Sequence, residues 1–533
     1  MPADPATLIS QAAGALARGD LAGAEQAAMA ALAASGNGSS DALHILGLIR
    51  LRQERLAEAA ALLAQADQAH PGQPRLLLNL GKVLAALGRL GEAEIILARG
   101  LVLAPDTALK ADFAGDLFSV QRQQHKREAA LETATLIRRL DPAQTAFDAE
   151  RFDLLAELGR HDDALTLAQA MLARDPANAQ LHRHYNSLLH RLGRDDEMFS
   201  SYDAAPPRAE LQLDKAMLQS QAGRDDDAHA TIAALLMREP DNAAALLSSA
   251  AMLTQGGRAS EAIALLEKAQ ARRPGNLSFK ASIGNAALRS GDAQRAAAML
   301  EDVVRGAPND NNSLARLSTA WRLLGEPRDE ALMGYDELVR IFDLEPPQGF
   351  SSMASFNAEL EDALASLHPK TREFLDQSLR GGTQTQGHLF GAGHALVNML
   401  KARIDEAVAR YIAELETDPA HPLRRRKTSS FAYNGSWSSR LATSGFHTNH
   451  IHPMGWISSC YYVGLPDIVT DENARQGWIK FGEPDFDAGL SLRRAIQPQA
   501  GRLVLFPSYM WHGTIPFHST QKRTTVAFDV VPA

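Results

Sequence analysis

The chain has 533 residues but a single cysteine, Cys460, so no disulfide can form within it. It also lacks any apolar run of roughly eighteen residues, so no membrane-spanning helix is expected. The first residues contain neither the basic stretch nor the apolar stretch of a secretory signal peptide. These absences together predict a cytoplasmic protein.

An excess of positive charge is lacking as well, since the formal net charge is -9. No cationic field would attract phosphates, so we expect neither a nucleic-acid nor a membrane partner. The local basic run at 424–427 is interpreted as a solvated loop in preference to a binding patch. The glycine-rich segment 377–387 is not a phosphate loop, because it has no GxxxxGK[ST] pattern. It is either a loop that lines a site or a connection between two helices.

The first two-thirds of the chain is rich in alanine and leucine and repeats itself. Glycine lets one helix stop before the next begins, proline ends the second helix of a pair, and small residues allow close packing. Five of the six intervals between the recurring prolines are 34 residues or close to a multiple of it. The recurring residues are Pro71, Pro105, Pro142, Pro176, Pro240, Pro274 and Pro308; Gly88, Gly159, Gly193, Gly223, Gly257, Gly291 and Gly325; and Ala93, Ala164, Ala228, Ala262 and Ala296.

A helix–turn–helix unit of this length, with small residues where the helices cross, resembles the tetratricopeptide repeat. About nine or ten repeats are predicted between residues 5 and 340, with an irregular one near 107–142 and a shortened one near 179–207. A solenoid of such repeats has a concave groove. We expect this groove to bind a protein or peptide; a spacer or self-association role is the alternative. The oligomeric state is not predicted.

The repeat pattern ends near 341–350, where two prolines and a glycine mark a boundary. Helices are expected at 356–367 and 395–415, and from residue 428 the hydrophobic period changes to two. Many short strands without long helices between them predict an antiparallel jelly roll. The expected fold class is therefore multidomain α plus β, with an α-solenoid at 1–340, supporting helices at 341–427 and a β core at 428–533. The expected strands are 430–434, 436–443, 457–463, 477–481, 502–506 and 523–531.

Three histidines in the β region form a candidate metal site. His450 and His452 are two residues apart, so in a strand both would point to one face. His447 is three residues from His450 and is expected to face the other way. His512 comes sixty residues after His452 and is expected on a distant strand. Together His450, His452 and His512 would hold a metal from one side and leave its other side open.

Two residues of the last expected strand suggest which kind of co-substrate would bind beside the metal. Arg523 and Thr525 are expected to share a face of that strand. A guanidinium binds a carboxylate through two hydrogen bonds, and a hydroxyl adds another donor. Such a pair near a three-ligand metal suits a dicarboxylate co-substrate that also binds the metal.

Four segments, 449–463, 501–508, 511–513 and 523–528, resemble the Fe(II)- and 2-oxoglutarate-dependent oxygenases. The first motif reads H-x-H, as in a bacterial branch of that family. The resemblance implies a double-stranded β-helix core that uses Fe(II), 2-oxoglutarate and O2. It also implies that His450 and His512 bind iron, and that Arg523 with Thr525 anchors the distal carboxylate of 2-oxoglutarate.

The chain departs from the family's usual pattern at His452, where aspartate or glutamate is familiar. One interpretation, which we favour, makes His452 the third ligand of a three-histidine site. The other places His452 beside the metal, with water completing the coordination. A weakened enzyme or a metal other than iron would also fit this change.

Three functions follow from these expectations. The favoured one is hydroxylation of a protein or peptide side chain that the repeats dock, a domain order also found in aspartyl/asparaginyl and prolyl hydroxylases. The alternatives are an oxygenase for a small molecule, with repeats used only for assembly, and a metal-binding repeat scaffold without turnover. Tyr461, Tyr462 and Lys480 are assigned either to the pocket or to the barrel core, and Cys460 to the core.

Overall fold

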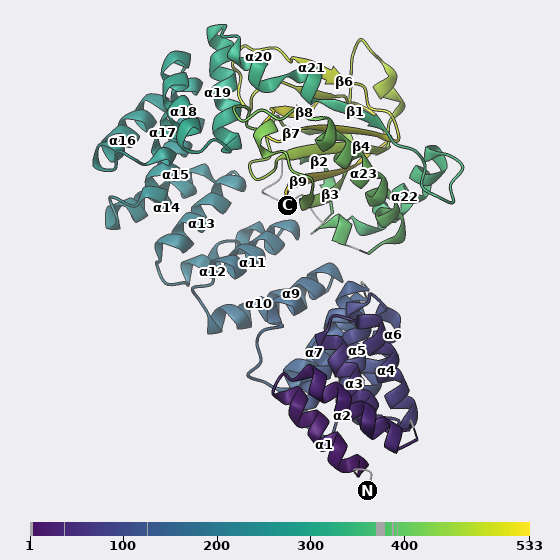
Figure 1. The fold of residues 1–533 in the computed structure, drawn as a ribbon. Helices are drawn as coiled ribbons and strands as arrows, with labels where there is room; N and C mark the ends of the chain where they lie inside the picture. The colour runs from purple at the N-terminus through teal and green to yellow at the C-terminus, as the bar shows by residue number, and fades with distance from the viewer. Residues whose placement is uncertain (1–3, 37, 125, 369–378, 386–387, 392) are drawn as a thin grey trace. The chain divides into compact units, whose positions relative to one another are not determined.

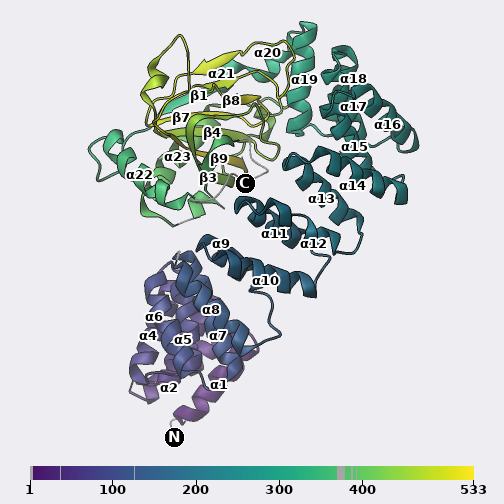
Figure 2. The same cartoon turned by 180° about the vertical axis from the view of Figure 1, so that it is seen from behind.

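A computed structural model describes residues 4–36, 38–124, 126–368, 379–385, 388–391 and 393–533. Residues 1–174 and 175–533 form two compact units. The expected fold class is confirmed, because helical repeats precede a β domain built of antiparallel sheets (Figures 1 and 2). Among the described helices, none combines the length and the apolarity that a membrane span requires.

The first unit consists of helices that follow one another in pairs, and each helix packs against the next along the chain. These helices are α1 (Pro5–Ala17), α2 (Leu21–Ala34), α3 (Ser40–Arg52), α4 (Leu56–Ala69), α5 (Pro74–Ala86), α6 (Leu90–Leu103), α7 (Thr107–Gln123), α8 (Arg127–Leu140), α9 (Asp148–Glu157) and α10 (His161–Arg174).

The second unit continues the helical pairs and then adds the β domain with its own helices. Its solenoid elements are α11 (Ala179–Arg191), η1 (Asp195–Glu197), α12 (Ser200–Asp203), α13 (Ala209–Gln221), α14 (Asp225–Arg238), α15 (Ala243–Gln255), α16 (Ala259–Arg272), α17 (Leu277–Arg289), α18 (Ala293–Gly306) and α19 (Asn311–Leu324). The later helices are α20 (Arg328–Met333), α21 (Tyr335–Leu338), α22 (Met353–Leu367), η2 (Leu389–Gly391), α23 (Ala395–Glu414), η3 (Arg424–Arg426) and η4 (Asp467–Thr470).

Several turns between the two helices of a repeat contain a glycine that the sequence singled out. Gly88 has a φ of 73° and Gly257 a φ of 74°, the left-handed conformation that glycine adopts without strain. The next residue is an arginine that pairs with an acidic residue three positions later, as in Arg258 with Glu261 at 2.7 Å. The small residues of the second helices, among them Ala93, are fully buried.

The repeat at 179–207 is shorter than its neighbours, as predicted. Its first helix, α11, is regular, but only the short η1 and α12 follow it. Phe199, just before α12, has a φ of 72°, which is rare for a residue with a side chain. The repeat at 107–142 keeps two full helices, α7 and α8.

The β domain consists of a six-stranded and a three-stranded antiparallel sheet. The six-stranded sheet has the order β1-β7-β4-β9-β3-β2, and the three-stranded sheet has the order β6-β5-β8. The strands are β1 (Arg340–Asp343), β2 (Leu379–Gln384), β3 (Phe431–His447), β4 (Ile457–Gly464), β5 (Ile479–Phe481), β6 (Arg494–Ile496), β7 (Arg502–Pro507), β8 (His512–Thr514) and β9 (Arg523–Pro532).

The core of the β domain is continuous with the supporting helices. α22 packs against β4, and α23 packs against β7. One buried cluster contains residues of both helices together with β4, β7 and β9, and it also takes in Leu314 of α19. The β domain, its helices and α19 therefore share one hydrophobic core.

The glycine-rich segment 377–387 corrects an expectation, because its described part forms strand β2 instead of a loop. β2 pairs antiparallel with β3, and a Cβ on Gly382 would lie 2.4 Å from the carbonyl oxygen of Arg440. This close approach of two backbones explains why glycine replaces the usual strand formers. Residues 377–378 and 386–387 lie outside the described part of the chain.

The basic run at 424–427 is half-buried, so the expectation of a solvated loop was wrong. Arg424 pairs with Glu337 at 2.5 Å and with Glu416 at 3.1 Å. Lys427 donates to the carbonyl of Leu415 at 2.5 Å, just beyond the end of α23. A cation at a helix C-terminus satisfies carbonyls that lack partners within the helix. The run fastens α23 to the rest of the second unit.

Candidate metal centre

A cavity of about 420 Å³ lies between the two sheets of the β domain. All five residues that the sequence singled out line it, namely His450, His452, His512, Arg523 and Thr525. The other lining residues are Gln384, Trp437, Ser439, His447, Ile451, Pro453, Met454, Ser459, Cys460, Ile479, Gly513, Thr514, Ala527 and Asp529.

One face of strand β9 runs along the cavity. Arg523, Thr525, Ala527 and Asp529 all line it, as alternate residues of a strand must if they point to one side. The shared face expected for Arg523 and Thr525 is therefore observed. The two charged residues lie at opposite ends of this face, so a cation and an anion are held several residues apart along one cavity.

The H-x-H segment corrects the expected local structure. His450 forms an isolated antiparallel bridge with His512, and His452 lies in the connection that leads to β4. The backbone N–H of His450 donates to the carbonyl of His512 at 2.9 Å, and the reverse bond measures 3.0 Å. His512, the first residue of β8, is therefore a direct backbone neighbour of His450 and does not lie on a strand far from it.

Each of the three histidines donates a hydrogen bond from Nδ1 to an acceptor that has no proton to give. His450 donates to the carbonyl of Thr448 at 2.7 Å, and His512 donates to the carbonyl of Met510 at 3.0 Å. His452 donates to the carboxylate of Asp529 at 2.6 Å. In neutral imidazole a proton on Nδ1 leaves the lone pair on Nε2. The backbone and Asp529 thus select the tautomer that binds a metal through Nε2.

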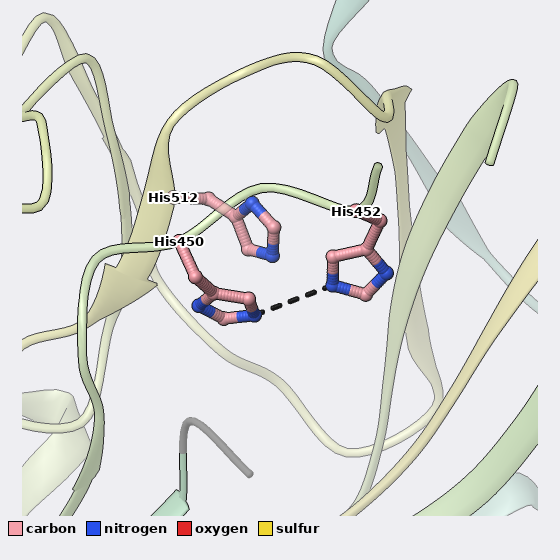
Figure 3. A group of neighbouring side chains, drawn as sticks. All are labelled: His450, His452 and His512. Atoms are coloured by element: carbon pink, nitrogen blue, oxygen red, sulfur yellow. Dashed lines mark hydrogen bonds between the residues drawn. The ribbon is translucent and has the colours of Figure 1, made fainter. Parts of the chain in front are cut away.

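The three rings converge, with one ring nitrogen of each facing the space between them (Figure 3). Their ligand nitrogens all lie within 4.8 Å of one another, and the Nε2 atoms of His450 and His452 are 3.3 Å apart. Two lone pairs at that separation repel unless a proton or a cation lies between them. The group can therefore hold a metal ion, since its donors are nitrogens in the arrangement that divalent transition metals prefer.

Burial keeps two of these imidazoles neutral. Burial, together with the neighbouring His452, lowers the pKa of His450 to about 3. Burial also lowers the pKa of His512 well below its usual value, and His450 and His452 add to that effect. A neutral imidazole offers a lone pair, whereas a protonated one repels a cation. Both rings therefore remain available as ligands at neutral pH.

Asp529 places a negative charge directly behind His452. Its Oδ1 accepts from His452 Nδ1 and from the hydroxyl of Ser458 at 2.6 Å. A carboxylate that accepts from a metal-binding histidine fixes the ring and makes its other nitrogen more basic. Asp529 therefore fixes the orientation of the His452 ring and favours a lone pair on its Nε2.

His447 does not face away from the site, so the expectation drawn from strand parity was wrong. It ends β3 and lines the cavity, with its ring centroid 6.0 Å from that of His450. Burial, with smaller contributions from His450 and Arg523, lowers its pKa well below the usual value. Its nitrogens lie outside the group of three that could share one metal.

Arg523 is 1% exposed and has its own place at the other end of the cavity. Its Nε donates to the carbonyl of Gly477 at 3.1 Å, and its guanidinium lies 5.1 Å from the centroid of the Tyr462 ring. In the described part of the chain no carboxylate forms an ion pair with it. A buried cation without a counter-charge costs several kcal/mol. The surroundings of Arg523 therefore fit a ligand that brings its own carboxylate.

Other residues that the sequence left undecided now have places. Tyr461 and Tyr462 are fully buried and belong to the core cluster, outside the cavity lining. Lys480 pairs with Glu483. Cys460 is buried as expected, but it also lines the cavity, and burial raises the pKa of its thiol.

Six polar or aromatic lining residues were not predicted, namely Gln384, Trp437, Ser439, Ser459, Thr514 and Asp529. Asp529 is six residues after Arg523, so the same strand parity that paired Arg523 with Thr525 also points to it. Trp437 lies on β3 with its ring stacked on His452 at a centroid distance of 5.7 Å. No pattern in the sequence distinguishes it from a core tryptophan.

Residues 435–529 match the family model described as "Putative 2OG-Fe(II) oxygenase". Tetratricopeptide repeat models match residues 10–74, 50–117, 213–276 and 253–320. The predicted architecture is confirmed: the chain carries tetratricopeptide repeats in its N-terminal part and a region similar to this oxygenase family near its C-terminus. No curated protein matches the chain.

Several solved structures are similar to parts of the chain. Naa15/Naa10 bound to HypK-THB shows 14% identity over 61% of this chain and 62% of that chain, with a TM-score of 0.36. PilF from Pseudomonas aeruginosa shows 22% identity over 40% of this chain and 97% of that chain, with a TM-score of 0.28. A Thermobaculum terrenum O-GlcNAc transferase mutant shows 28% identity over 26% of this chain and 27% of that chain, with a TM-score of 0.24. This chain therefore spans less than two thirds of the first and the last of these chains.

The substitution Asp529→Asn tests whether the charge behind His452 matters for metal binding. The amide oxygen can still accept from His452 Nδ1, but the negative charge is lost. We expect the dissociation constant for a divalent metal to rise roughly 10- to 100-fold, measured by titration with Co(II). Asp405→Asn is the matched control, since Asp405 accepts from Lys401 at 2.8 Å outside the cavity lining. Equal Co(II) affinity in Asp529→Asn and the unaltered protein would contradict the expectation.

Proposed function

We propose that the β domain is an Fe(II)- and 2-oxoglutarate-dependent oxygenase that hydroxylates a side chain of a protein or peptide docked by the repeats. One observation carries this proposal: a single cavity holds three converging histidines at one end and, at the other, a buried arginine without a carboxylate partner among the described residues. The match of residues 435–529 to the oxygenase family supports the same chemistry.

His450, His452 and His512 are the proposed iron ligands, each through Nε2. His452 binds the metal in preference to standing beside it, because its Nδ1 is occupied by Asp529 and its Nε2 lies 3.3 Å from that of His450. Bound iron supplies the activation of O2 that couples oxidation of 2-oxoglutarate to succinate and CO2 with hydroxylation of a C–H bond. The protein's own task is to position the reactants and keep water away from them.

Arg523 and Thr525 are the proposed binding site for the distal carboxylate of 2-oxoglutarate. The guanidinium is buried, so its hydrogen bonds to a carboxylate form without competition from bulk water. The Thr525 hydroxyl lines the cavity two residues further along the same face of β9. This placement orients the rest of the co-substrate along β9 toward the histidines.

The cavity lining favours a substrate group without charge. The lining in the described part of the chain has one arginine, Arg523, which is assigned to the co-substrate, and one carboxylate, Asp529, which is bonded to His452. Apolar side chains lie next to the histidines, among them Trp437 and Met454, and Met454 is 75% exposed. Tetratricopeptide repeats generally mediate protein–protein interactions, which is why we assign the substrate to a polypeptide.

The pair of substitutions His452→Ala and His512→Ala tests whether His452 is a ligand. Both variants should lose metal to a similar extent, with affinity falling more than about 100-fold, because each removes one of three donors. Metal content after anaerobic loading with Fe(II) is the measurement. His421→Ala is the control, since His421 is a buried histidine that bonds to the carbonyl of Leu332 away from the cavity. Full iron retention by His452→Ala beside loss in His512→Ala would place His452 next to the metal instead.

The substitution Arg523→Met tests the co-substrate site. The full-length protein with Fe(II) and O2 should convert 2-oxoglutarate to succinate, and the variant should need roughly 10- to 100-fold more 2-oxoglutarate, because a charged hydrogen-bond pair is worth about 1.5–3 kcal/mol. The KM for 2-oxoglutarate is the measurement. Arg502→Met is the control, because Arg502 of β7 pairs with Asp343 of β1 and neither residue lines the cavity. The oxygenase function fails if the unaltered protein neither forms succinate nor binds 2-oxoglutarate.

The substrate class is tested with a mixture of protein-derived peptides. The full-length protein with Fe(II) and 2-oxoglutarate should add one oxygen atom to an uncharged side chain of particular peptides, which mass spectrometry detects. His512→Ala under the same conditions should leave the peptides unchanged. If peptides and folded proteins never gain oxygen while a small metabolite does, the polypeptide assignment is wrong.

A further inference from the structure

The last solenoid helix, α19, reaches the segment that carries His452. Asn311, its first residue, is 3% exposed, and its side-chain amide donates to two backbone carbonyls. One bond goes to His452 at 2.9 Å, and the other goes to Gly455 at 2.8 Å. These carbonyls lie at the two ends of a tight turn, in which the N–H of Gly455 also donates to the carbonyl of His452 at 3.3 Å. A single amide group from a repeat therefore holds both ends of the turn.

The same helix also reaches the segment that carries His512. Trp511, the residue before His512, donates from its indole N–H to the carbonyl of Ala315 and to the hydroxyl of Thr319, both at 3.1 Å. The Trp511 ring packs with Ala315 and with Ile451, the residue between the two histidines of the H-x-H segment. Figures 1 and 2 both show α19 alongside the β domain.

We propose that α19 is a working part of the metal centre, with Asn311 as the positioning residue for His452. This inference deepens the proposed function and rests on the three histidines binding a metal. Asn311 does not touch the metal. It acts by holding the backbone turn from which the His452 ring extends.

The chemistry of asparagine suits this role. An amide nitrogen has two protons, so it can serve two carbonyls at once, whereas a hydroxyl has only one. Without Asn311 the His452 carbonyl keeps only the N–H of Gly455 at 3.3 Å, and the buried Gly455 carbonyl keeps only Arg426 Nη1 at 3.4 Å. Losing the two shorter bonds, each worth about 0.5–1.5 kcal/mol, favours a shift of the turn, and such a shift changes where His452 Nε2 points. The distance of 3.3 Å between the Nε2 atoms of His450 and His452 therefore depends on Asn311.

A consequence is that metal binding and the packing of α19 are linked. A metal that holds His452 and His512 in place also holds the two segments on which α19 rests. Because linkage is reciprocal, stabilising the packing of α19 strengthens metal binding by the same factor by which the bound metal stabilises that packing. The link runs through Asn311 on one side and through Trp511 on the other.

The experiment compares Asn311→Asp with Asn276→Ala in the full-length protein, using Co(II) as the probe. The aspartate side chain has the same shape as asparagine but would face the two carbonyls with oxygen atoms instead of protons. Asn276 is also the residue at the start of a solenoid helix, where it accepts from the N–H groups of Ser278 and Phe279, so its loss weakens the solenoid without touching the turn. Trp511→Phe is a second variant, which keeps an aromatic ring but removes both indole hydrogen bonds.

Three readouts decide the matter. Asn311→Asp should bind Co(II) roughly tenfold more weakly and show a changed d–d absorption spectrum, the size expected when support for a metal ligand is lost. Trp511→Phe should change in the same direction, and Asn276→Ala should match the unaltered protein in both measurements. Hydrogen exchange of α19 should slow when Co(II) binds to the unaltered protein and slow less in Asn311→Asp.

The proposal is overturned if Asn311→Asp binds Co(II) with unchanged affinity and spectrum, or if Asn276→Ala changes both by as much. It is also overturned if the unaltered protein binds no Co(II). These outcomes are separate from the failure of the oxygenase function, which is read from succinate formation. A protein that binds Co(II) as described but never forms succinate keeps the positioning role of Asn311 and loses the oxygenase assignment.

Discussion

The whole site depends on one constraint, which is that each of three imidazoles must find an acceptor for its Nδ1 proton. Two of them use backbone carbonyls only two residues away, Thr448 for His450 and Met510 for His512. In both cases the acceptor lies two residues before the histidine, and the two histidines meet in an isolated bridge between the segment at 450 and the start of β8. His452 uses Asp529 of β9 instead. The irregular backbone around the histidines is thus what sets their tautomers and points their Nε2 atoms together.

Asp529 places a carboxylate next to a group of three histidines that could hold a metal. The familiar facial triad holds its negative charge directly on the metal. In this chain the carboxylate lies one residue further out, on Asp529, which accepts from Nδ1 of His452. Strand β9 brings this about because alternate residues share a face, so Asp529 at one end and Arg523 at the other line the same cavity. One strand therefore brings to the same cavity both the carboxylate behind His452 and the buried guanidinium of Arg523.

The parts of this structure that the sequence predicts are those with a periodic pattern. Alternation predicted β3, strand-forming residues between turn signals predicted β4, β7 and β9, and strand parity would have revealed Asp529 as it revealed Thr525. β5, β6 and β8 have three residues each, too few for alternation to show their full extent. β2 was not predicted because it contains Gly381 and Gly382. The backbone of β3 approaches both too closely for a side chain, so this strand lacks the usual strand-forming residues there. The bond from Asn311 to His452 joins residues 141 positions apart, and no local signal reports it.

That long-range contact also changes how the two parts of the chain should be divided. A boundary drawn near residue 340 marks the end of the repeat pattern, but it cuts between α19 and the carbonyls and indole that α19 contacts. Removing α19 would leave the carbonyls of His452 and Gly455 with only their longer bonds, and the indole N–H of Trp511 without Ala315 and Thr319. Each lost bond costs about 0.5–1.5 kcal/mol, so together they are a sizeable fraction of the roughly 5–15 kcal/mol by which a domain is stable. The last repeat is therefore thermodynamically part of the β domain, although its sequence belongs to the solenoid.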